Sequence, residues 1–166
     1  AMIHGEGTET IEIEGVDELQ PTRFGIISDR IEAATLAIAT ALTRGDVIIE
    51  NAPVEHLAAV IETLRRIGVT IESADDSTLR VTAADAFRPA ELTAAPYPGL
   101  PTDTQAQFMA LLTLADGESR MTDAVFPERF MHASELIRMG AQICLTGNSA
   151  QITGVSKMSG APVMAS

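Results

Sequence analysis

The chain has 166 residues, of which 46% are hydrophobic and 20% charged, a balance typical of a folded globular domain and not of a disordered segment. Its formal net charge of −12 and its single lysine, Lys157, argue against the basic surface with which proteins bind nucleic acid. No apolar run reaches the roughly 18 residues of a membrane-spanning helix, and no signal peptide or disulfide partner for Cys144 is present, so we expect a soluble cytoplasmic protein.

The residues in chain order predict two copies of one unit. Pairs of residues of the same kind stand 72 positions apart, namely Gly45 and Gly117, Leu64 and Leu136, and Gly68 and Gly140. After an opening strand at Thr8–Ile13, the first copy is predicted to contain a helix, a strand, a helix and a hairpin, at Asp29–Thr43, Val47–Glu50, Val54–Ile67, and Val69–Glu72 with Thr78–Val81. The second copy repeats this order at Thr104–Ala115, Ser119–Thr122, Glu128–Met139, Gln142–Thr146 and Ala150–Thr153.

These units are predicted to form one truncated domain over residues 1–166. Repeat one spans about 8–85, a stiff proline-rich linker covers 86–101, and repeat two spans about 102–156. Residues 157–166 are similar to the lead-in to the second helix, and we expect them to precede a third repeat that is missing. The apolar surface that a third repeat would cover favours self-association of the chain.

The apolar patterns of the helices predict the layering. Ile31–Leu42 and Ala106–Ala115 are apolar on almost every side, as in helices that are buried all round. Val54–Ile67 is amphipathic, and Gly68 is predicted to end it in a left-handed conformation, as Gly140 does in the second copy. An α/β fold with helices inside and sheets outside therefore follows, an inside-out arrangement of two βαβαββ-type repeats.

Two segments contain candidate functional residues. In Leu100–Gln107, Thr102 and Gln105 have the spacing of a helix-capping box, while Asp103 could instead be a carboxylate held at a helix start. In Val125–His132, Arg129 stands where the first copy has Leu57, either as a surface residue or as a functional cation.

The remaining residues that could bind a metal or cofactor are interpreted as structural. His132 is interpreted as a packed side chain and Cys144 as a small buried hydrophobe. We expect no cofactor and no metal, because the sequence has no metal-binding spacing and no phosphate-binding loop.

Several strings of residues, taken together and in order, resemble the UDP-N-acetylglucosamine enolpyruvyl transferases. They are Arg30-Ile-Glu-Ala33, Ala95-Pro-Tyr-Pro-Gly99, Pro101-Thr-Asp-Thr-Gln-Ala-Gln-Phe-Met-Ala110, Arg129-Phe-Met-His132, Glu135-Leu-Ile-Arg-Met-Gly140 and Met158-Ser-Gly-Ala161. The resemblance implies a UDP-N-acetylglucosamine 1-carboxyvinyltransferase, which moves the enolpyruvyl group of phosphoenolpyruvate to the 3-hydroxyl of UDP-N-acetylglucosamine. This transfer is the first committed step of peptidoglycan synthesis. The implied fold has two inside-out domains of three repeats each, with the substrates between them.

The same resemblance assigns roles to three residues. Asp103 matches the carboxylate that contacts the sugar hydroxyl and is the candidate base, Val125 matches a residue whose backbone contacts the sugar nucleotide, and Arg129 matches an arginine of the cleft. The family's cysteine-bearing loop and its phosphate-binding cations belong largely to the other domain, so we expect this chain to be inactive alone. Pro127-Glu128 stands where Glu-Asn is usual, which affects the expected shape of that loop.

Two alternatives remain open. One is an enzyme of the same fold that acts on shikimate 3-phosphate, which the Pro101–Gln107 string disfavours. The other is a non-catalytic binding or scaffold module built from the same repeats.

Overall fold

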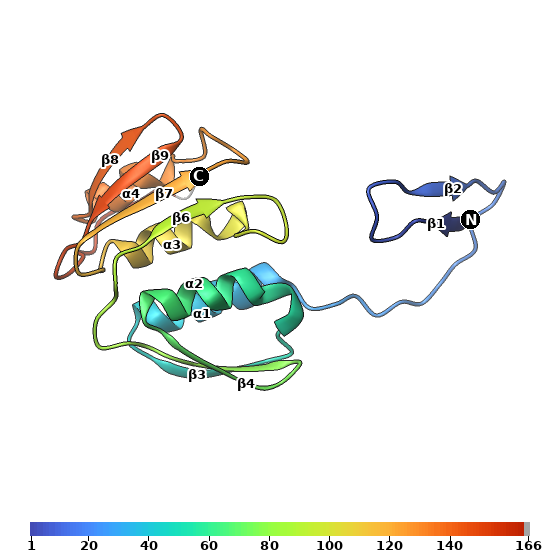
Figure 1. Cartoon of the computed structure of the whole chain (residues 1–166), viewed down its shortest axis with the longest axis horizontal. Helices are drawn as coiled ribbons and strands as arrows, with labels where there is room; N and C mark the ends of the chain where they lie inside the picture. The colour runs from blue at the N-terminus through green and yellow to red at the C-terminus, as the bar shows by residue number, and fades with distance from the viewer. Residues whose placement is uncertain (165–166) are drawn as a thin grey trace.

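Two β-sheets enclose a layer of helices in the computed structural model, which describes residues 1–164 (Figure 1). Repeat one contributes α1 (Arg30–Leu42), the 3₁₀ helix η1 (Val54–Leu57), α2 (Ala58–Ile67), and β3 (Asp46–Glu50), β4 (Thr70–Asp75) and β5 (Thr78–Thr82). Its strands form an antiparallel sheet in the order β3-β5-β4.

Repeat two reproduces this plan and adds one strand. It contains β6 (Glu91–Ala94), the 3₁₀ helix η2 (Thr102–Thr104), α3 (Gln105–Leu112), β7 (Glu118–Asp123), α4 (His132–Arg138), β8 (Gln142–Thr146) and β9 (Ser149–Thr153). Its sheet has the order β6-β7-β9-β8, in which β7-β9-β8 corresponds to β3-β5-β4 and β6 runs parallel to β7.

The helices α1 and α3 pack against each other between the sheets, as the inside-out prediction requires. Gln107 of α3 donates a hydrogen bond to the hydroxyl of Thr35 in α1 at 3.0 Å, and these two residues are 72 positions apart. The largest fully buried side chains come from both repeats and include Ile38, Leu57, Leu64, Ile67, Leu79, Phe87, Phe108, Met109, Leu111, Leu112, Met121 and Ile152. The prediction of an inside-out α/β fold is confirmed.

The burial of α1 differs from the prediction on one side. Leu36, Ala39 and the C-terminal capping residue Thr43 are exposed along one stripe, although the matching positions in repeat two are buried. The prediction that α1 is buried all round is therefore wrong for this stripe, because nothing in the described structure covers it.

The helix ends follow their local sequence. The Asp29 side chain accepts a hydrogen bond from the Ile31 amide at 2.7 Å and caps α1. Gly68 and Gly140 follow α2 and α4 with φ of 114° and 99°, so the predicted left-handed residues are confirmed. The helix α4 begins at His132 and not at Glu128, because Phe126–Phe130 forms a turn with a hydrogen bond from the Arg129 amide to the Phe126 carbonyl.

The first 29 residues lie outside the body of the fold. A separate hairpin pairs β1 (Met2–His4) with β2 (Glu12–Glu14), and an extended segment that we call the arm (residues 15–29) connects it to α1 (Figure 1). The predicted strand Thr8–Ile13 is wrong in most of its length. Gly5 and Gly7 have positive φ, and the Thr8 amide bonds to the Gly5 carbonyl, so the first of these residues belong to a turn.

Two further predictions need correction. The segment 86–101 is not wholly a linker, because Leu92 and Ala94 are buried in β6, between prolines at positions 89 and 96. Cys144 is exposed and not buried. It pairs with the exposed Gln151 on the outer side of the sheet, and period-two alternation turns its neighbour Ile143 inward instead.

Within residues 1–164, none of the helices combines the length and the apolar character needed to cross a lipid bilayer.

Candidate functional site

The start of α3 does not form the predicted capping box. The Thr102 hydroxyl donates to the Oδ2 atom of Asp123 at 2.5 Å and does not cap the helix. The buried Gln105 side chain donates to the Arg129 carbonyl at 3.2 Å and does not turn back to the helix start. The capping-box prediction is wrong, because Thr102 is bonded to the last residue of β7 and Gln105 to the segment that follows β7.

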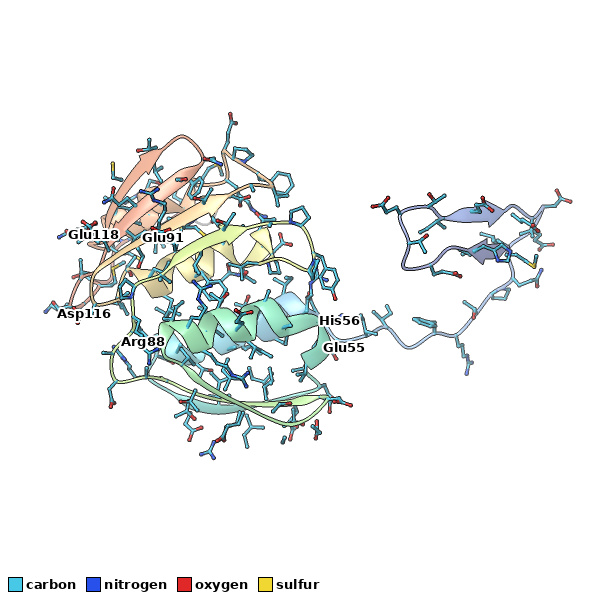
Figure 2. All side chains as sticks on the ribbon, viewed as in Figure 1. Glu55, His56, Arg88, Glu91, Asp116 and Glu118 are labelled. Carbon is cyan, nitrogen blue, oxygen red and sulfur yellow. The ribbon has the colours of Figure 1, made fainter. Side chains whose placement is uncertain are left out.

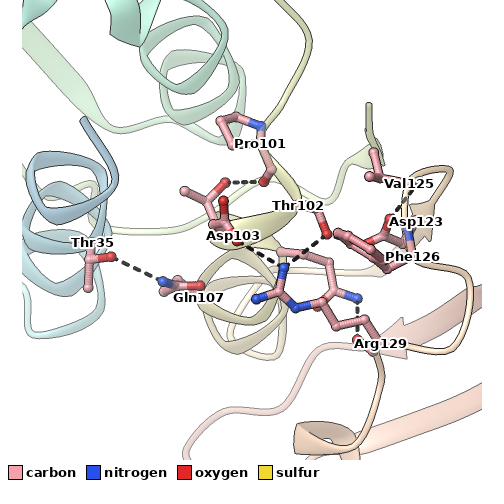
Figure 3. A network of polar contacts seen from close by, with 11 residues as sticks. Thr35, Pro101, Thr102, Asp103, Gln107, Asp123, Val125, Phe126 and Arg129 are labelled. Carbon is pink, nitrogen blue, oxygen red and sulfur yellow. Dashed lines mark hydrogen bonds and ion pairs between the residues drawn. The ribbon is translucent and has the colours of Figure 1, made fainter. Parts of the chain in front are cut away.

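Asp123 joins the two predicted functional segments. Its carboxylate is fully buried at the end of β7, where Oδ1 accepts hydrogen bonds from the amides of Val125 at 2.9 Å and Phe126 at 2.7 Å. Together with the bond from Thr102, three donors surround this one side chain (Figure 3). The turn that contains Val125 is therefore tied to the start of α3.

Asp103 and Arg129 meet above this junction. Arg129 Nη1 lies 2.9 Å from Asp103 Oδ1 and 3.4 Å from the Thr102 hydroxyl, and its guanidinium is 5.8 Å from the centre of the Phe126 ring. The Asp103 side chain is 53% exposed and that of Arg129 47%, so both remain open to a ligand. Asp103 makes no capping bond, and an exposed pair of this kind contributes at most about 1 kcal/mol to stability.

The structure brings Asp103, Val125 and Arg129 together, although 22 positions separate the first two in the chain. The Val125 amide is already bonded to Asp123. Its carbonyl is the backbone group that could accept a hydrogen bond from a ligand at this edge.

The sequence reasoning missed Asp123 as the residue that holds the site together. A signal was present, because an aspartate directly after a strand commonly accepts hydrogen bonds from amides two or three residues later. Its bond to Thr102 had no such signal, since it depends on how β7 and η2 pack.

His132 lies beside the site and is partly buried. Its Nε2 atom is 3.1 Å from the sulfur of Met109, and its ring stacks with Phe130 at 6.3 Å between centres. Burial lowers the pKa of His132, and the positive charge of Arg129 lowers it further. The interpretation of His132 as a packed side chain is confirmed.

The starts of α1 and α3 lie at the same end of the helix layer (Figure 1). Arg30 at the start of α1 lies 5.3 Å from the centre of the Tyr97 ring, in the loop that leads to η2. A cavity of about 550 Å³ is lined by Arg44, Asp116 and Lys157, among others, and none of its lining residues belongs to this site. Within residues 1–164, no three His, Cys, Asp or Glu side chains are grouped so as to share a metal ion.

Comparison with known proteins identifies the family. The family profile described as EPSP synthase (3-phosphoshikimate 1-carboxyvinyltransferase) matches residues 1–166. The chain belongs to the EPSP synthase family. The fold agrees, because the enolpyruvyl transferase NikO from Streptomyces tendae superimposes with a TM-score of 0.70 at 26% identity over 78% of this chain and 31% of NikO. An EPSP synthase from Acinetobacter baumannii shares the fold with a TM-score of 0.62 at 22% identity, over 86% of this chain and 35% of that one.

Curated members of the family resemble the chain more strongly in sequence. The UDP-N-acetylglucosamine 1-carboxyvinyltransferase of Geotalea daltonii is 51% identical over 165 residues, which cover 99% of this chain and 39% of that protein. The enzyme of the same name from Methylacidiphilum infernorum is 49% identical over 166 residues, or 100% of this chain and 39% of the relative. The resemblance to this branch of the family is confirmed, and the chain spans about two fifths of the length of these relatives.

Proposed function

We propose that this chain forms the sugar-nucleotide side of the active site of a UDP-N-acetylglucosamine 1-carboxyvinyltransferase. The observation that carries the proposal is the junction of η2 with the turn after β7, where Asp103, Arg129 and the Val125 backbone share one edge. The high identity to relatives of that name supports the choice of substrates. On this proposal repeat one lies within 8–85 and repeat two within 102–156, the segment 86–101 connects them and adds β6 to the second sheet, and residues 157–166 lead to a third repeat.

The transfer needs a base at the sugar hydroxyl. The hydroxyl oxygen forms a bond to the enolpyruvyl carbon that carries phosphate, the bond from that carbon to the phosphate oxygen breaks, and the hydroxyl proton must leave. Asp103 is the carboxylate placed to accept it, and Arg129 orients that carboxylate through its 2.9 Å contact. The carbonyl of Val125 holds the nucleotide from the neighbouring turn.

The isolated chain is expected to lack turnover. Arg129 is already paired with Asp103, and the chain has a net charge of −12, so it offers little attraction to a diphosphate or to phosphoenolpyruvate. We therefore propose that further cations come from outside these 166 residues, in a cytoplasmic enzyme of cell-wall synthesis. Self-association of the chain through uncovered apolar surface also remains a prediction.

A graft tests the proposal. The matching 39% of the Geotalea daltonii protein is replaced by this chain, and phosphate release from phosphoenolpyruvate is measured with each acceptor. We expect release with UDP-N-acetylglucosamine and none with shikimate 3-phosphate. Turnover with shikimate 3-phosphate alone would support the alternative acceptor. A folded graft that turns over neither acceptor would favour a non-catalytic module.

A further inference from the structure

Gln105 connects the helix start that contains Asp103 to the turn that contains Arg129. It is the first residue of α3, two positions after Asp103, and it is 1% exposed. Its Nε2 atom donates a hydrogen bond to the Arg129 carbonyl at 3.2 Å. Because a carbonyl oxygen can only accept, the amide nitrogen of Gln105 has to face it, which fixes the orientation of this side chain.

The backbone of Arg129 is held on both sides by hydrogen bonds. Its amide donates to the Phe126 carbonyl at 3.0 Å, and its carbonyl accepts the bond from Gln105. Its guanidinium returns to the start of α3, where Nη1 lies 2.9 Å from Asp103 Oδ1 (Figure 3). Asp103, Arg129 and Gln105 therefore form a closed ring of contacts, in which the position of each one restricts the other two.

The exposed part of this ring depends on its buried part. The side chains of Asp103 and Arg129 are 53% and 47% exposed, and a pair this open to solvent is too weak to hold one geometry by itself. Charged residues such as Arg88 and Asp116 project at the opposite end of the helix layer, so they cannot steady the pair (Figure 2). The bond from Gln105, whose side chain is buried, is better shielded from solvent.

The Oε1 atom of Gln105 indicates that this residue is not present for stability alone. It is buried, and within residues 1–164 no hydrogen-bond donor reaches it. A buried acceptor without a donor opposes folding, and an apolar side chain of similar length would avoid that cost. The hydrogen bond that Gln105 does make is to Arg129, so the benefit of an amide at this position lies there.

Gln107 has the same chemistry but a different contact. It lies two residues later in α3, and its Oε1 atom is also buried without a donor among residues 1–164. Its Nε2 atom bonds to the Thr35 hydroxyl of α1 at 3.0 Å, and not to the turn that follows β7. Gln107 is therefore a matched control, because the same substitution removes the same groups without releasing Arg129.

We propose that Gln105 is a positioning residue for the base. It fixes the Arg129 backbone, so that the guanidinium stays against Asp103 and holds its carboxylate in one orientation. The catalytic consequence rests on the proposed function, whereas the effect on the contact between Asp103 and Arg129 does not.

NMR of the 166-residue chain, with its side-chain carboxyl carbons labelled, tests that contact through the signal of Asp103. Arg129→Met should shift this signal, and Gln105→Met should shift it in the same direction, while Gln107→Met should leave it in place. Methionine is close in size to glutamine, so the two glutamine variants should have similar urea midpoints. An Asp103 signal unmoved by Gln105→Met would overturn the proposal. A Gln105→Met chain much less stable than Gln107→Met would do the same, because Gln105 would then support the fold instead.

Kinetics of the grafted enzyme test the consequence for catalysis. Gln105→Met should lower kcat about tenfold or more with a smaller change in KM, because a slightly misplaced orienting group can slow a reaction by up to about a hundredfold. Gln107→Met should keep the parent kcat. In an Arg129→Met background, Gln105→Met should lower kcat no further, although it removes the same bond to the backbone.

A parent-like kcat for Gln105→Met in an active graft, or a further loss in the Arg129→Met background, would contradict the positioning role. An inactive parent graft would instead count against the proposed function, and the NMR comparison would still decide whether Gln105 holds Arg129 against Asp103.

Discussion

Asp123 determines the local geometry of the site, because its buried carboxylate accepts three hydrogen bonds. Asp123→Ala would leave two amides and the Thr102 hydroxyl without their acceptor. An unsatisfied buried group costs about 1–3 kcal/mol, and because these three donors are only partly buried we expect the free energy of unfolding to fall by about 2 kcal/mol or more. Urea denaturation of the 166-residue chain measures this loss.

Thr102→Val provides the comparison for Asp123→Ala. It removes a single hydrogen bond to the same carboxylate and should cost about 1 kcal/mol. If the two variants are equally stable, the amides of Val125 and Phe126 do not depend on Asp123, and the site lacks the junction described above.

His132 gives the chain a component of stability that depends on pH. Its pKa is lowered in the folded state by burial and by Arg129, so below about pH 6.5 the unfolded chain binds a proton that the folded chain resists. This component of stability is full above the unfolded pKa and is lost as the pH falls toward the lowered folded pKa. His132→Gln should remove this pH dependence, which urea midpoints at pH 7.5 and 5.5 would detect. A parent and variant with parallel pH profiles would contradict it.

At the scale of elements, the segments that follow α3 and β9 approach closely because one residue has no side chain. Gly154 follows β9, and a Cβ atom there would lie 1.6 Å from the Ala115 carbonyl oxygen. Gly154→Ala must therefore shift backbone, and we expect a loss of more than about 2 kcal/mol in the free energy of unfolding. Gly160→Ala, where a Cβ atom would meet nothing within 4 Å, should change stability by less than about 0.5 kcal/mol. Equal urea midpoints for the two variants would show that the close approach is not maintained.

Most elements could be predicted because their own residues determine them. The amphipathic pattern of residues 54–67 and the glycine at position 68 were sufficient for α2 and its end. β6 could not be recognised from local pattern among the four prolines of residues 86–101, because it exists through its pairing with β7. Cys144 was misplaced because three apolar residues in a row do not reveal which face of an edge strand is outside.

The candidate site could be predicted from the sequence only in part. Asp103, Val125 and Arg129 were found through family resemblance, and their proximity agrees with it. The bonds of Thr102 to the end of β7 and of Gln105 to the segment after it are tertiary, and the local capping pattern predicted a different partner for each.

At the scale of the whole molecule, two repeats place one polar edge at the starts of α1 and α3. The sheets on either side cover most of both helices, so the site residues lie on a rigid support while their side chains stay exposed. The chain covers 39% of its relatives, and on our proposal the remaining part of the enzyme closes over this edge.

The turnover of Asp103→Asn in the grafted enzyme tests the central claim most directly. An amide can still bond to the sugar hydroxyl but cannot accept its proton, so kcat should fall by about two orders of magnitude or more while substrate affinity changes less. Asp116→Asn, which makes the same change at an exposed residue away from the site, should keep the parent kcat. If Asp103→Asn turns over within a few-fold of the parent, Asp103 is not the base and the proposed role of this edge is wrong.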